Sequence, residues 1–308
     1  MVFTDFKTGK DDTGRRLDKV IRIFIPSATL PNIYKSLRKG LIKVNGAKSS
    51  PDYRICEGDV IQIADFIVKD AASDGDTTAN VRAPAQMLDK SWIIFENEHI
   101  LILNKPAGIN VHSAKKGEIS LQELVTAYYN ATRTNDSLSF KPGPLHRIDK
   151  YTQGLVCFSM STAGAQWFSS NMKSHNIKKT YEAIVQGKVE KEEIWKDKIE
   201  KLEETGQSFH TMQIKADESG LECITKITPL GVFSSEGHTL TRVLFDIETG
   251  RQHQIRSQSA FHGHPLFGDT AYGGVKTVGN KGLFYLQAKQ IIFPKNELKI
   301  PEKITLED

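Results

Sequence analysis

Cysteine is scarce in this 308-residue sequence, and long hydrophobic runs are missing from it. The three cysteines, Cys56, Cys157 and Cys223, lie far apart, which excludes a dense disulfide framework and a CxxC metal site and is typical of a reducing cytoplasm. The longest apolar runs, such as 92–95 and 100–103, are far shorter than the roughly 18 residues of a membrane-spanning helix. The amino-terminal segment also lacks the apolar stretch of a secretory signal. We therefore expect a cytoplasmic protein without a membrane segment.

Charge of one sign is not in large excess, and common cofactor motifs are missing. Lys and Arg number 41 and Asp and Glu number 37, so the net charge is only +4 and nucleic acid would need a local basic surface. No GxGxxG, GxxxxGK(S/T) or GxSxG motif occurs, which argues against a nucleotide-binding loop and a nucleophile elbow. His253, His262 and His264 have no Cys or carboxylate at metal-binding spacing. We predict no metal and no cofactor.

A local basic surface is predicted near the amino terminus. Residues 31–48 hold five basic side chains and no acidic one, namely Lys35, Arg38, Lys39, Lys43 and Lys48. Such a run is by itself usually a solvated face. Here Ile33 and Leu37 are four residues apart, so both point to one side of a helix and most of the basic residues fall on the other side.

Short elements surround this helix. Residues 14–25 have helical apolar spacing, and 41–46 and 57–63 have the composition of strands with adjacent turns. The segments RLDKVI, IYKSLRKGLIKVNG and GDVIQI resemble the ribosomal-protein-S4-type RNA-binding domain over about residues 13–65. The resemblance implies that basic side chains here bind RNA phosphates, with salt-dependent and largely sequence-independent affinity. These residues are Lys35, Arg38, Lys39 and Lys43.

The composition changes at 69–86. This segment is rich in small residues, contains proline, and has Val81 as its only large apolar residue. Such a composition predicts a flexible linker. We therefore predict a small S4-like RNA-binding domain at 1–68 and a second domain at 87–308.

The second domain is rich in predicted strands. Apolar runs of strand character occur at 92–108, 155–160, 180–187, 222–231, 239–250 and 287–294. Helical spacing occurs only at 120–130, 161–174 and around 253–263. This balance predicts an α+β domain with a mixed, mainly antiparallel sheet. The charge run at 188–204 is predicted to be a solvated excursion from that sheet.

Chemically versatile side chains gather at 144–155. His146, Arg147, Asp149 and Lys150 lie between a Gly/Pro turn and an apolar strand, and loops in such positions often carry functional groups. The basic neighbours would keep Asp149 ionised, which makes it a candidate nucleophile or base. On composition alone, a surface salt bridge is the alternative interpretation.

Two further segments carry candidate residues. Arg251, His253 and Arg256 follow a predicted strand at the start of 248–274, a segment whose later residues look like turns and a loop beside a cleft. Tyr181 lies at the mouth of another predicted strand, where it is either a packing residue or a flat face for stacking a base.

These segments resemble the motifs of one family. HRIDKYTQGL resembles the HRLDxxTSGL signature of the RluA family of pseudouridine synthases, and KTYEAIVQG resembles its KxYxAxVxG strand. ETGRQHQIR and GHPLFGDTAYG resemble its TGRxHQIR and GHPIxGDxxYG segments, and ILILNKPAGINVH resembles its opening strand and turn. The resemblance covers about 92–296. One departure is Gln153, which stands where the family usually has Ser.

The resemblance implies an isomerase that needs no cofactor. Uridine in RNA becomes pseudouridine when the C1′–N1 bond breaks, the uracil rotates, and C1′ bonds to C5. Asp149 would be the catalytic carboxylate, either attacking C1′ or removing a sugar proton. Arg256 would be its bidentate partner. Tyr181 would stack on a flipped-out base and serve in proton transfer at C5.

Further residues receive supporting roles from the same resemblance. Arg147 would hold the RNA after flipping, and His146 would line the same loop. Lys105 and Arg251 are candidates for phosphate or pocket contacts. Every one of these roles depends on the second domain forming a single site.

Two classes of function remain open on the sequence. The first is an RluA-type pseudouridine synthase, and the second is a non-catalytic RNA-binding or ribosome-assembly factor on the same scaffold. The basic amino-terminal domain favours large-subunit ribosomal RNA over transfer RNA as the partner. No obligate protein partner is predicted.

Overall fold

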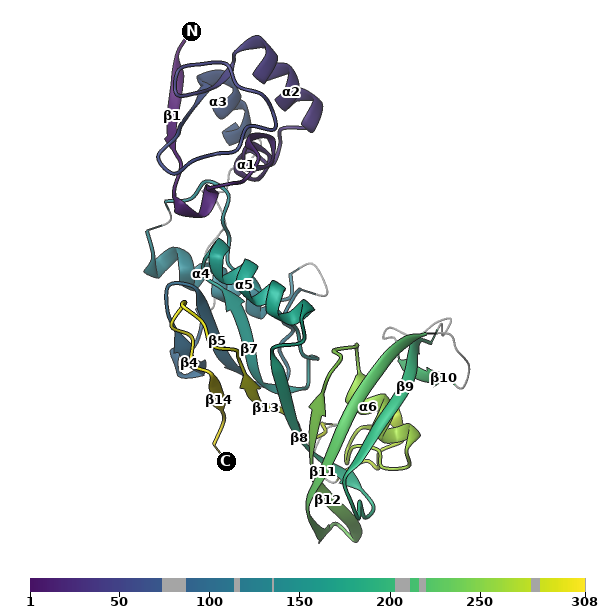
Figure 1. Cartoon of the computed structure of the whole chain (residues 1–308). Coiled ribbons are helices and arrows are strands. Elements are labelled where there is room, and N and C mark those ends of the chain that lie inside the picture. The colour runs from purple at the N-terminus through teal and green to yellow at the C-terminus, as the bar shows by residue number, and fades with distance from the viewer. Residues whose placement is uncertain are drawn as a thin grey trace. The chain divides into compact units, whose positions relative to one another are not determined.

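The computed structural model describes residues 1–73, 87–113, 117–134, 136–202, 211–215, 220–277 and 283–307. The chain divides into two compact units, and Figure 1 labels most of their helices and strands. Unit 1 comprises Met1–Leu88, Gln122–Gly143 and Ser159–Gln166, and unit 2 comprises Asp89–Leu121, Pro144–Phe158 and Trp167–Asp308. Within the described ranges, no helix has both the length and the apolar character needed to cross a membrane.

The amino-terminal part of unit 1 combines a small sheet with three helices. The antiparallel sheet has the order β1-β3-β2, with β1 (Phe3–Lys7), β2 (Ile42–Val44) and β3 (Val60–Ala64). The helices are α1 (Leu17–Phe24), α2 (Leu30–Lys39) and α3 (Asp65–Ser73), and a 3-10 helix, η1 (Lys10–Asp12), precedes them. The elements predicted between residues 14 and 63 are confirmed. Helix α2 ends at Gly40, whose φ of 70° is the left-handed conformation that favours glycine.

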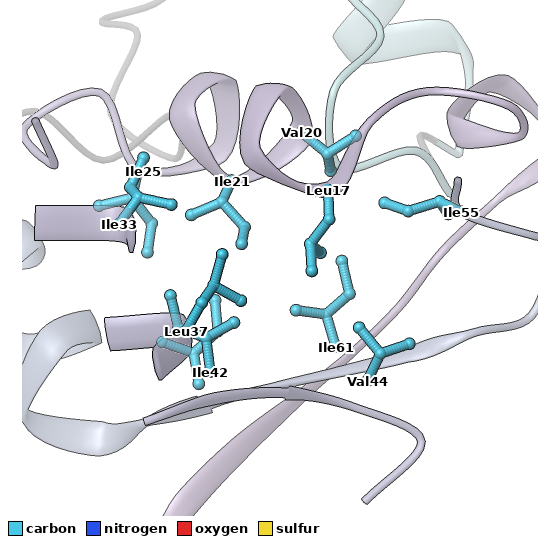
Figure 2. Close-up of a cluster of buried hydrophobic side chains, with 11 residues drawn as sticks. Leu17, Val20, Ile21, Ile25, Ile33, Leu37, Ile42, Val44, Ile55 and Ile61 are labelled. Atoms are coloured by element: carbon cyan, nitrogen blue, oxygen red, sulfur yellow. The ribbon is translucent and has the colours of Figure 1, made fainter. Parts of the chain in front are cut away.

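Buried aliphatic side chains hold this part of unit 1 together. Leu17, Val20 and Ile21 lie at helical spacing on α1 and are each at most 1% exposed. Figure 2 shows them grouped with side chains from α2 and β2. The apolar face of α2 adds Ile33 and Leu37 to the same cluster. Removing each such side chain from water contributes about 1.5–3 kcal/mol, so the cluster orients the polar face of α2 toward solvent.

Asp12 connects segments of unit 1 that are distant in sequence. Its carboxylate accepts hydrogen bonds from the hydroxyls of Ser137 and Ser139, at 2.7 and 2.6 Å. Three backbone N–H groups, of Gly9, Leu138 and Ser139, also donate to it, each at 3.0 Å. Asp12 is fully buried. A carboxylate so fully bonded is structural, because each lost bond would leave a buried donor without a partner.

The predicted linker at 69–86 lies only partly within the described residues. Helix α3 extends to Ser73, so residues 69–73 are helical rather than irregular. Residues 74–86 lie outside the described residues. The division into a domain at 1–68 and a domain at 87–308 stays a prediction.

Most of unit 2 is built on a mixed sheet with the order β10-β9-β11-β12-β8-β13-β7-β5-β4, with β14 beside β13 and β6 beside β7. The strands are β4 (Ile93–Glu96), β5 (Ile100–Lys105), β6 (Gly143–Pro144), β7 (Gln153–Ser159), β8 (Lys178–Gln186), β9 (Glu193–Lys201), β10 (Met212–Lys215), β11 (Leu221–Ser235), β12 (His238–Ile247), β13 (Leu286–Ile292) and β14 (Lys303–Thr305). Strand β13 pairs in parallel with β7 and antiparallel with β8. Strand β11 pairs antiparallel with both of its neighbours, β9 and β12. The predicted mixed, mainly antiparallel sheet is confirmed.

Three further α-helices form at the predicted places in the sequence. They are α4 (Leu121–Thr132), α5 (Thr162–Lys173) and α6 (Gln254–Phe261), and the 3-10 helices η3 (Lys90–Trp92) and η4 (Thr270–Tyr272) connect other segments. Helix α6 contacts β9 and β10, and its residues Gln254 and Gln258 make side-chain hydrogen bonds with Thr225 of β11. It starts at His253, a non-glycine residue with a φ of 52°. The sheet therefore supports the helix start that carries Arg256.

The prediction of a solvated excursion at 188–204 is wrong. Residues 193–201 form β9, which lies inside the sheet between β10 and β11. Trp195 and Ile199 are only 3% and 0% exposed. They are four residues apart on a strand, so their side chains point to the same face. The many charged neighbours concealed this period of two, and residues 203 and 204 lie outside the described residues.

A close backbone approach fixes the end of the loop that carries Asp149. Gly154 has a φ of 108°, and a Cβ there would lie 2.4 Å from the carbonyl oxygen of Ala288. Only glycine permits this approach without a shift of the backbone. The contact lets β7 pair in parallel with β13, with Gln153 opposite Gln287 and Gly154 opposite Ala288. The Asp149 loop therefore enters the sheet at a fixed position.

Candidate active site

A pocket of about 270 Å³ in unit 2 collects residues from segments that the sequence singled out separately. The loop before β7 contributes His146, Arg147, Ile148, Asp149 and Thr152, and β8 contributes Lys179 and Tyr181. The start of α6 and the turn before it contribute Gly250, Arg251, His253, Gln254, Ile255 and Arg256. Met172, Ile247 and Leu286 complete the lining. Three sequence motifs thus meet in one cavity.

Asp149 lies on the wall of this pocket with 21% of its side chain exposed. Arg256 Nη1 and His253 Nε2 each approach its Oδ2 to 3.7 Å. These distances exceed those of hydrogen bonds, so both groups act on Asp149 as electrostatic neighbours. As far as the described residues extend, the carboxylate keeps its hydrogen-bonding capacity for a ligand in the pocket.

Arg256 makes its bidentate pair with Asp269, not with Asp149 as the sequence predicted. Its Nε and Nη2 donate to Asp269 at 2.7 and 2.9 Å, and Asp269 is only 2% exposed. The guanidinium also lies between two rings, with its Cζ 4.8 Å from the centroid of Tyr272 and 4.6 Å from that of Phe284. Because Asp269 occupies one edge of the guanidinium, only Nη1 remains to face Asp149. The arginine is therefore held rigidly beside the carboxylate.

Strand β8 presents Tyr181 and Lys179 to the pocket. The two residues are two positions apart, so they share one face of the strand. Burial, reinforced by the charge of Asp149, raises the pKa of Tyr181 above its usual value, which keeps the hydroxyl protonated at neutral pH. Burial lowers the pKa of Lys179. This wall thus combines a neutral phenol with an amine.

His146 lines the pocket as an uncharged ring. Its Nε2 accepts a hydrogen bond from the N–H of Cys157 at 3.1 Å, and its ring stacks on Phe168 with an angle of 4° between the planes. Burial lowers the pKa of His146 to about 3, so the ring stays neutral under physiological conditions. Because Nε2 is the acceptor, the ring proton belongs on Nδ1. That atom is buried and has no hydrogen-bond partner among the described residues.

Lys105 is buried and lies outside the pocket lining, which differs from the pocket contact expected from the sequence. It is completely buried, and its Nζ donates to the backbone carbonyls of Pro106, Ile109 and Lys150, each at 3.0 Å. These three bonds use all three donors of an ammonium group. Burial lowers the pKa of Lys105 to about 8. Lys150 directly follows Asp149 in the sequence. The buried Lys105 therefore holds the backbone of the loop that carries Asp149.

Arg147 and Arg251 lie at the exposed edge of the pocket. Both side chains are exposed and both residues belong to its lining. Arg251 Nε donates to the carbonyl of Glu222 at 3.0 Å, which fixes part of the guanidinium. Their positive charges are therefore placed where a polyanion entering the pocket would pass.

The four basic candidates of unit 1 occupy two kinds of position. Lys35, Arg38 and Lys39 are exposed on the polar face of α2. Lys43 is half-buried on β2, between two inward-pointing residues, and its Nζ lies 4.7 Å from the ring centroid of Phe3. Only the three α2 residues therefore share one surface.

Sequence reasoning missed three residues of the site. The sequence predicts a turn at Asp269. Its ion pair with Arg256, 13 residues earlier, has no local sequence signal. The sequence marks His253 as a candidate residue but suggests no role for it beside Asp149, and the motifs do not single out Lys179. Lys179 was detectable, because it lies two positions before Tyr181 in a predicted strand.

The three histidines considered as metal ligands have separate partners. His253 contacts the Tyr272 hydroxyl, His262 contacts Asp197 at 3.0 Å, and His264 contacts the Gln186 carbonyl at 3.0 Å. In the part of the chain that the structure describes, no group of three or more His, Cys, Asp or Glu is placed to hold a metal ion.

Solved structures share the fold of this chain. Human RNA Pseudouridylate Synthase Domain Containing 1 superposes with a TM-score of 0.56 and 21% identity, covering 70% of this chain and 82% of the human one. Human RNA Pseudouridylate Synthase Domain Containing 4 superposes with a TM-score of 0.53 and 18% identity, covering 67% and 85%. At these identities the comparison defines the fold alone, which is that of pseudouridine synthases.

Sequence comparison extends the assignment from fold to family. The family described as RNA pseudouridylate synthase matches residues 99–261, which hold all the candidate catalytic residues. Ribosomal large subunit pseudouridine synthase C of Rickettsia bellii is 29% identical over 291 residues, covering 91% of this chain and 90% of the relative. The Escherichia coli protein of the same name is 24% identical over 271 residues, covering 85% and 77%. The chain belongs to the RNA pseudouridylate synthase family, and is thus an isomerase that acts on RNA.

Proposed function

We propose that this enzyme isomerises uridine in large-subunit ribosomal RNA, with Asp149 as its catalytic carboxylate. The observation that carries the proposal is the placement of Asp149. It is a partly exposed carboxylate that lies 3.7 Å from an arginine nitrogen and lines the same pocket as Tyr181. The ribosomal target is supported by the names of the relatives, which match this chain over most of its length.

The reaction needs no net addition or removal of atoms. The C1′–N1 bond of uridine breaks, the uracil turns, and a C1′–C5 bond forms, while C5 loses a proton and N1 gains one. Asp149 acts at the sugar, either as the nucleophile at C1′ or as the base for a sugar proton. In either role, the positive charge of Arg256 lies 3.7 Å from the carboxylate and complements its negative charge.

Tyr181 and the edge arginines hold the substrate in this proposal. A paired base cannot place its glycosidic bond inside a pocket, so the uridine is flipped out at a cost of a few kcal/mol. Tyr181 offers an aromatic face for the base, and its protonated hydroxyl supplies a hydrogen-bond donor. Arg147 and Arg251, exposed at the edge, contact the RNA around the flipped nucleotide.

The amino-terminal region at 1–68 adds sequence-independent RNA affinity as an S4-like domain. Support comes from the three exposed basic residues on one face of α2, Lys35, Arg38 and Lys39. Lys43 contributes from β2, where its ammonium also interacts with the Phe3 ring. Phosphate contacts from these residues would position the RNA without reading its sequence.

Mapping pseudouridines in cells with and without the gene tests the ribosomal target. The proposal expects one or more pseudouridines of large-subunit ribosomal RNA to disappear when the gene is deleted. They should return when the wild-type gene is restored, and should stay absent when the Asp149→Asn gene is restored at an equal protein level. If ribosomal RNA is unchanged and pseudouridines vanish from transfer RNA instead, the target is wrong although the reaction class stands.

A further inference from the structure

A histidine beside the catalytic carboxylate has no role in the mechanism above. His253 Nε2 lies 3.7 Å from Asp149 Oδ2, and its side chain is only 16% exposed. On the other side of the ring, Nδ1 lies 2.8 Å from the Tyr272 hydroxyl. The imidazole thus lies between the pocket carboxylate and a half-buried phenol.

We propose that His253 and Tyr272 are positioning residues that orient Asp149 for the isomerisation. The proposal rests on the function proposed above. In it, the Tyr272 hydroxyl donates to His253 Nδ1, which places the single ring proton on Nε2, facing Asp149. The N–H group then directs Oδ2 of the carboxylate toward the protein and leaves Oδ1 for the sugar.

The hydrogen bonds around Tyr272 support this arrangement. The backbone N–H of Met212 donates to the Tyr272 oxygen at 2.8 Å, and this group has no alternative role because a backbone N–H only donates. Burial raises the pKa of Tyr272 to about 12, so its hydroxyl keeps the proton that it donates onward. A bond in the opposite direction would leave the lone pair of His253 Nε2 facing a carboxylate, which electrostatic repulsion disfavours.

The surroundings of His253 keep the ring neutral. Burial lowers the pKa of His253, and the charged groups that face it are Asp149, Arg256, Asp269 and Arg147. Of these, the two carboxylates favour protonation and the two guanidinium groups oppose it. A neutral ring has one N–H, so its tautomer decides whether it is a donor or an acceptor toward Asp149.

The backbone at His253 gives an independent sign of function. Its φ of 52° and ψ of 20° are left-handed values at the first residue before α6. This conformation costs a residue with a side chain more than it costs glycine, and it persists where surrounding structure holds it. Here it carries the imidazole into the pocket, beside Arg256 on the same helix start.

Three variants, assayed with RNA carrying C5-tritiated uridine, test the proposal. His253→Leu removes the donor, and we expect kcat to fall about 10–100-fold with KM changed less than about 3-fold. His253→Gln keeps an N–H at a similar reach, and we expect at least a 5-fold recovery of kcat relative to His253→Leu.

Tyr272→Phe separates positioning from packing, because it removes the hydroxyl but keeps the ring beside Arg256. We expect a 5–10-fold loss of kcat when His253 is present and less than a 2-fold loss in the His253→Gln background. The matched control is His175→Leu, since His175 also has a positive φ of 54° but is exposed and outside the pocket lining. This control should leave kcat unchanged.

The kinetic results distinguish a failure of the His253 inference from a failure of the proposed function. Equal losses of kcat in His253→Leu and His253→Gln would assign His253 a packing role and overturn the inference. Unchanged kcat in His253→Leu would overturn it as well. Absence of tritium release by the wild-type enzyme on every RNA would instead contradict the proposed function.

Discussion

Two carboxylates share one arginine in this structure, and they are held in different ways. Asp269 is 2% exposed and accepts two hydrogen bonds from Arg256, at 2.7 and 2.9 Å. Asp149 is 21% exposed and lies 3.7 Å from the remaining nitrogen of the same guanidinium. Asp269 therefore fixes the position of Arg256. Asp149 interacts with the charge of Arg256 but forms no hydrogen bond with it.

The difference separates the residues that hold the site from those that react in it. Buried polar groups with all their bonds formed stabilise the fold, because any loss leaves an unsatisfied partner. Asp269 and Lys105 belong to this class, as does Asp12 in unit 1. A reactive carboxylate needs the opposite condition, with open hydrogen-bonding capacity and a fixed charge nearby. Substitution of a fully bonded buried group should therefore reduce stability, and substitution of Asp149 should reduce activity alone.

The largest expected effect is on turnover by Asp149→Asn. In the proposed mechanism the carboxylate acts at the sugar, so we expect its loss to decrease tritium release by about 10³-fold or more. Because Asp149 is partly exposed and makes no short ion pair, the free energy of unfolding should change by about 0.5 kcal/mol or less. Asp246→Asn, an exposed carboxylate on β12 outside the pocket, is the control and should remain active. Normal turnover by Asp149→Asn would refute its catalytic assignment.

Asp269→Asn should affect both properties. It breaks a buried bidentate pair, and leaving Arg256 without its charged partner should cost about 3 kcal/mol of stability, measured by urea unfolding. Arg256 would also lose its fixed position, so turnover should fall by about 10²-fold. A variant with full activity and reduced stability would show that Asp149 does not depend on this arginine.

Because the pKa of Lys105 is lowered by burial, this residue should make the free energy of unfolding depend on pH. Its pKa is about 8 in the folded protein and about 10.5 unfolded, so below pH 8 the folded state carries the cost of a buried ammonium. Between pH 8 and 10.5 the unfolded state binds more protons, and stability therefore rises with pH. Relative to Lys105→Met, the unfolding free energy of the wild type should increase by up to about 3 kcal/mol across this range. A constant difference would mean that Lys105 is not desolvated.

The smallest effect is expected from the basic face of α2. Changing Lys35, Arg38 and Lys39 together to Ala should weaken RNA binding and reduce the slope of log K against log salt by up to about three charges. Lys7→Ala, an exposed lysine on β1, is the comparison for loss of charge alone. An unchanged slope in the triple variant would remove α2 from the RNA-binding surface.

Local patterns were sufficient for most of the fold. Alternating apolar residues predicted the strands, and spacing of three and four predicted helices such as α1 and α2. Exceptions include residues 69–73, which belong to α3 and not to a linker, and β9, where Trp195 and Ile199 lie within a highly charged run. Composition outweighed periodicity there, although the buried face of a strand needs only every second residue to be apolar.

The sequence predicted which residues line the site better than it predicted the hydrogen bonds and ion pairs between them. Asp149, Tyr181 and Arg256 were named from motifs and line one pocket. The bond from Arg256 to Asp269 depends on how a turn folds back onto a helix, which no local pattern encodes. Lys105 was misplaced because lysine is seldom buried, and its three carbonyl partners come from backbone geometry that exists only in the folded chain.

Tritium release from large-subunit ribosomal RNA carrying C5-tritiated uridine tests the central claim most directly. If the Asp149 pocket isomerises uridine, purified wild-type enzyme should release one tritium for each pseudouridine formed, without any added cofactor. RNA that binds the enzyme yet releases no tritium, although the protein is folded, would contradict the assignment of this pocket as the site of isomerisation.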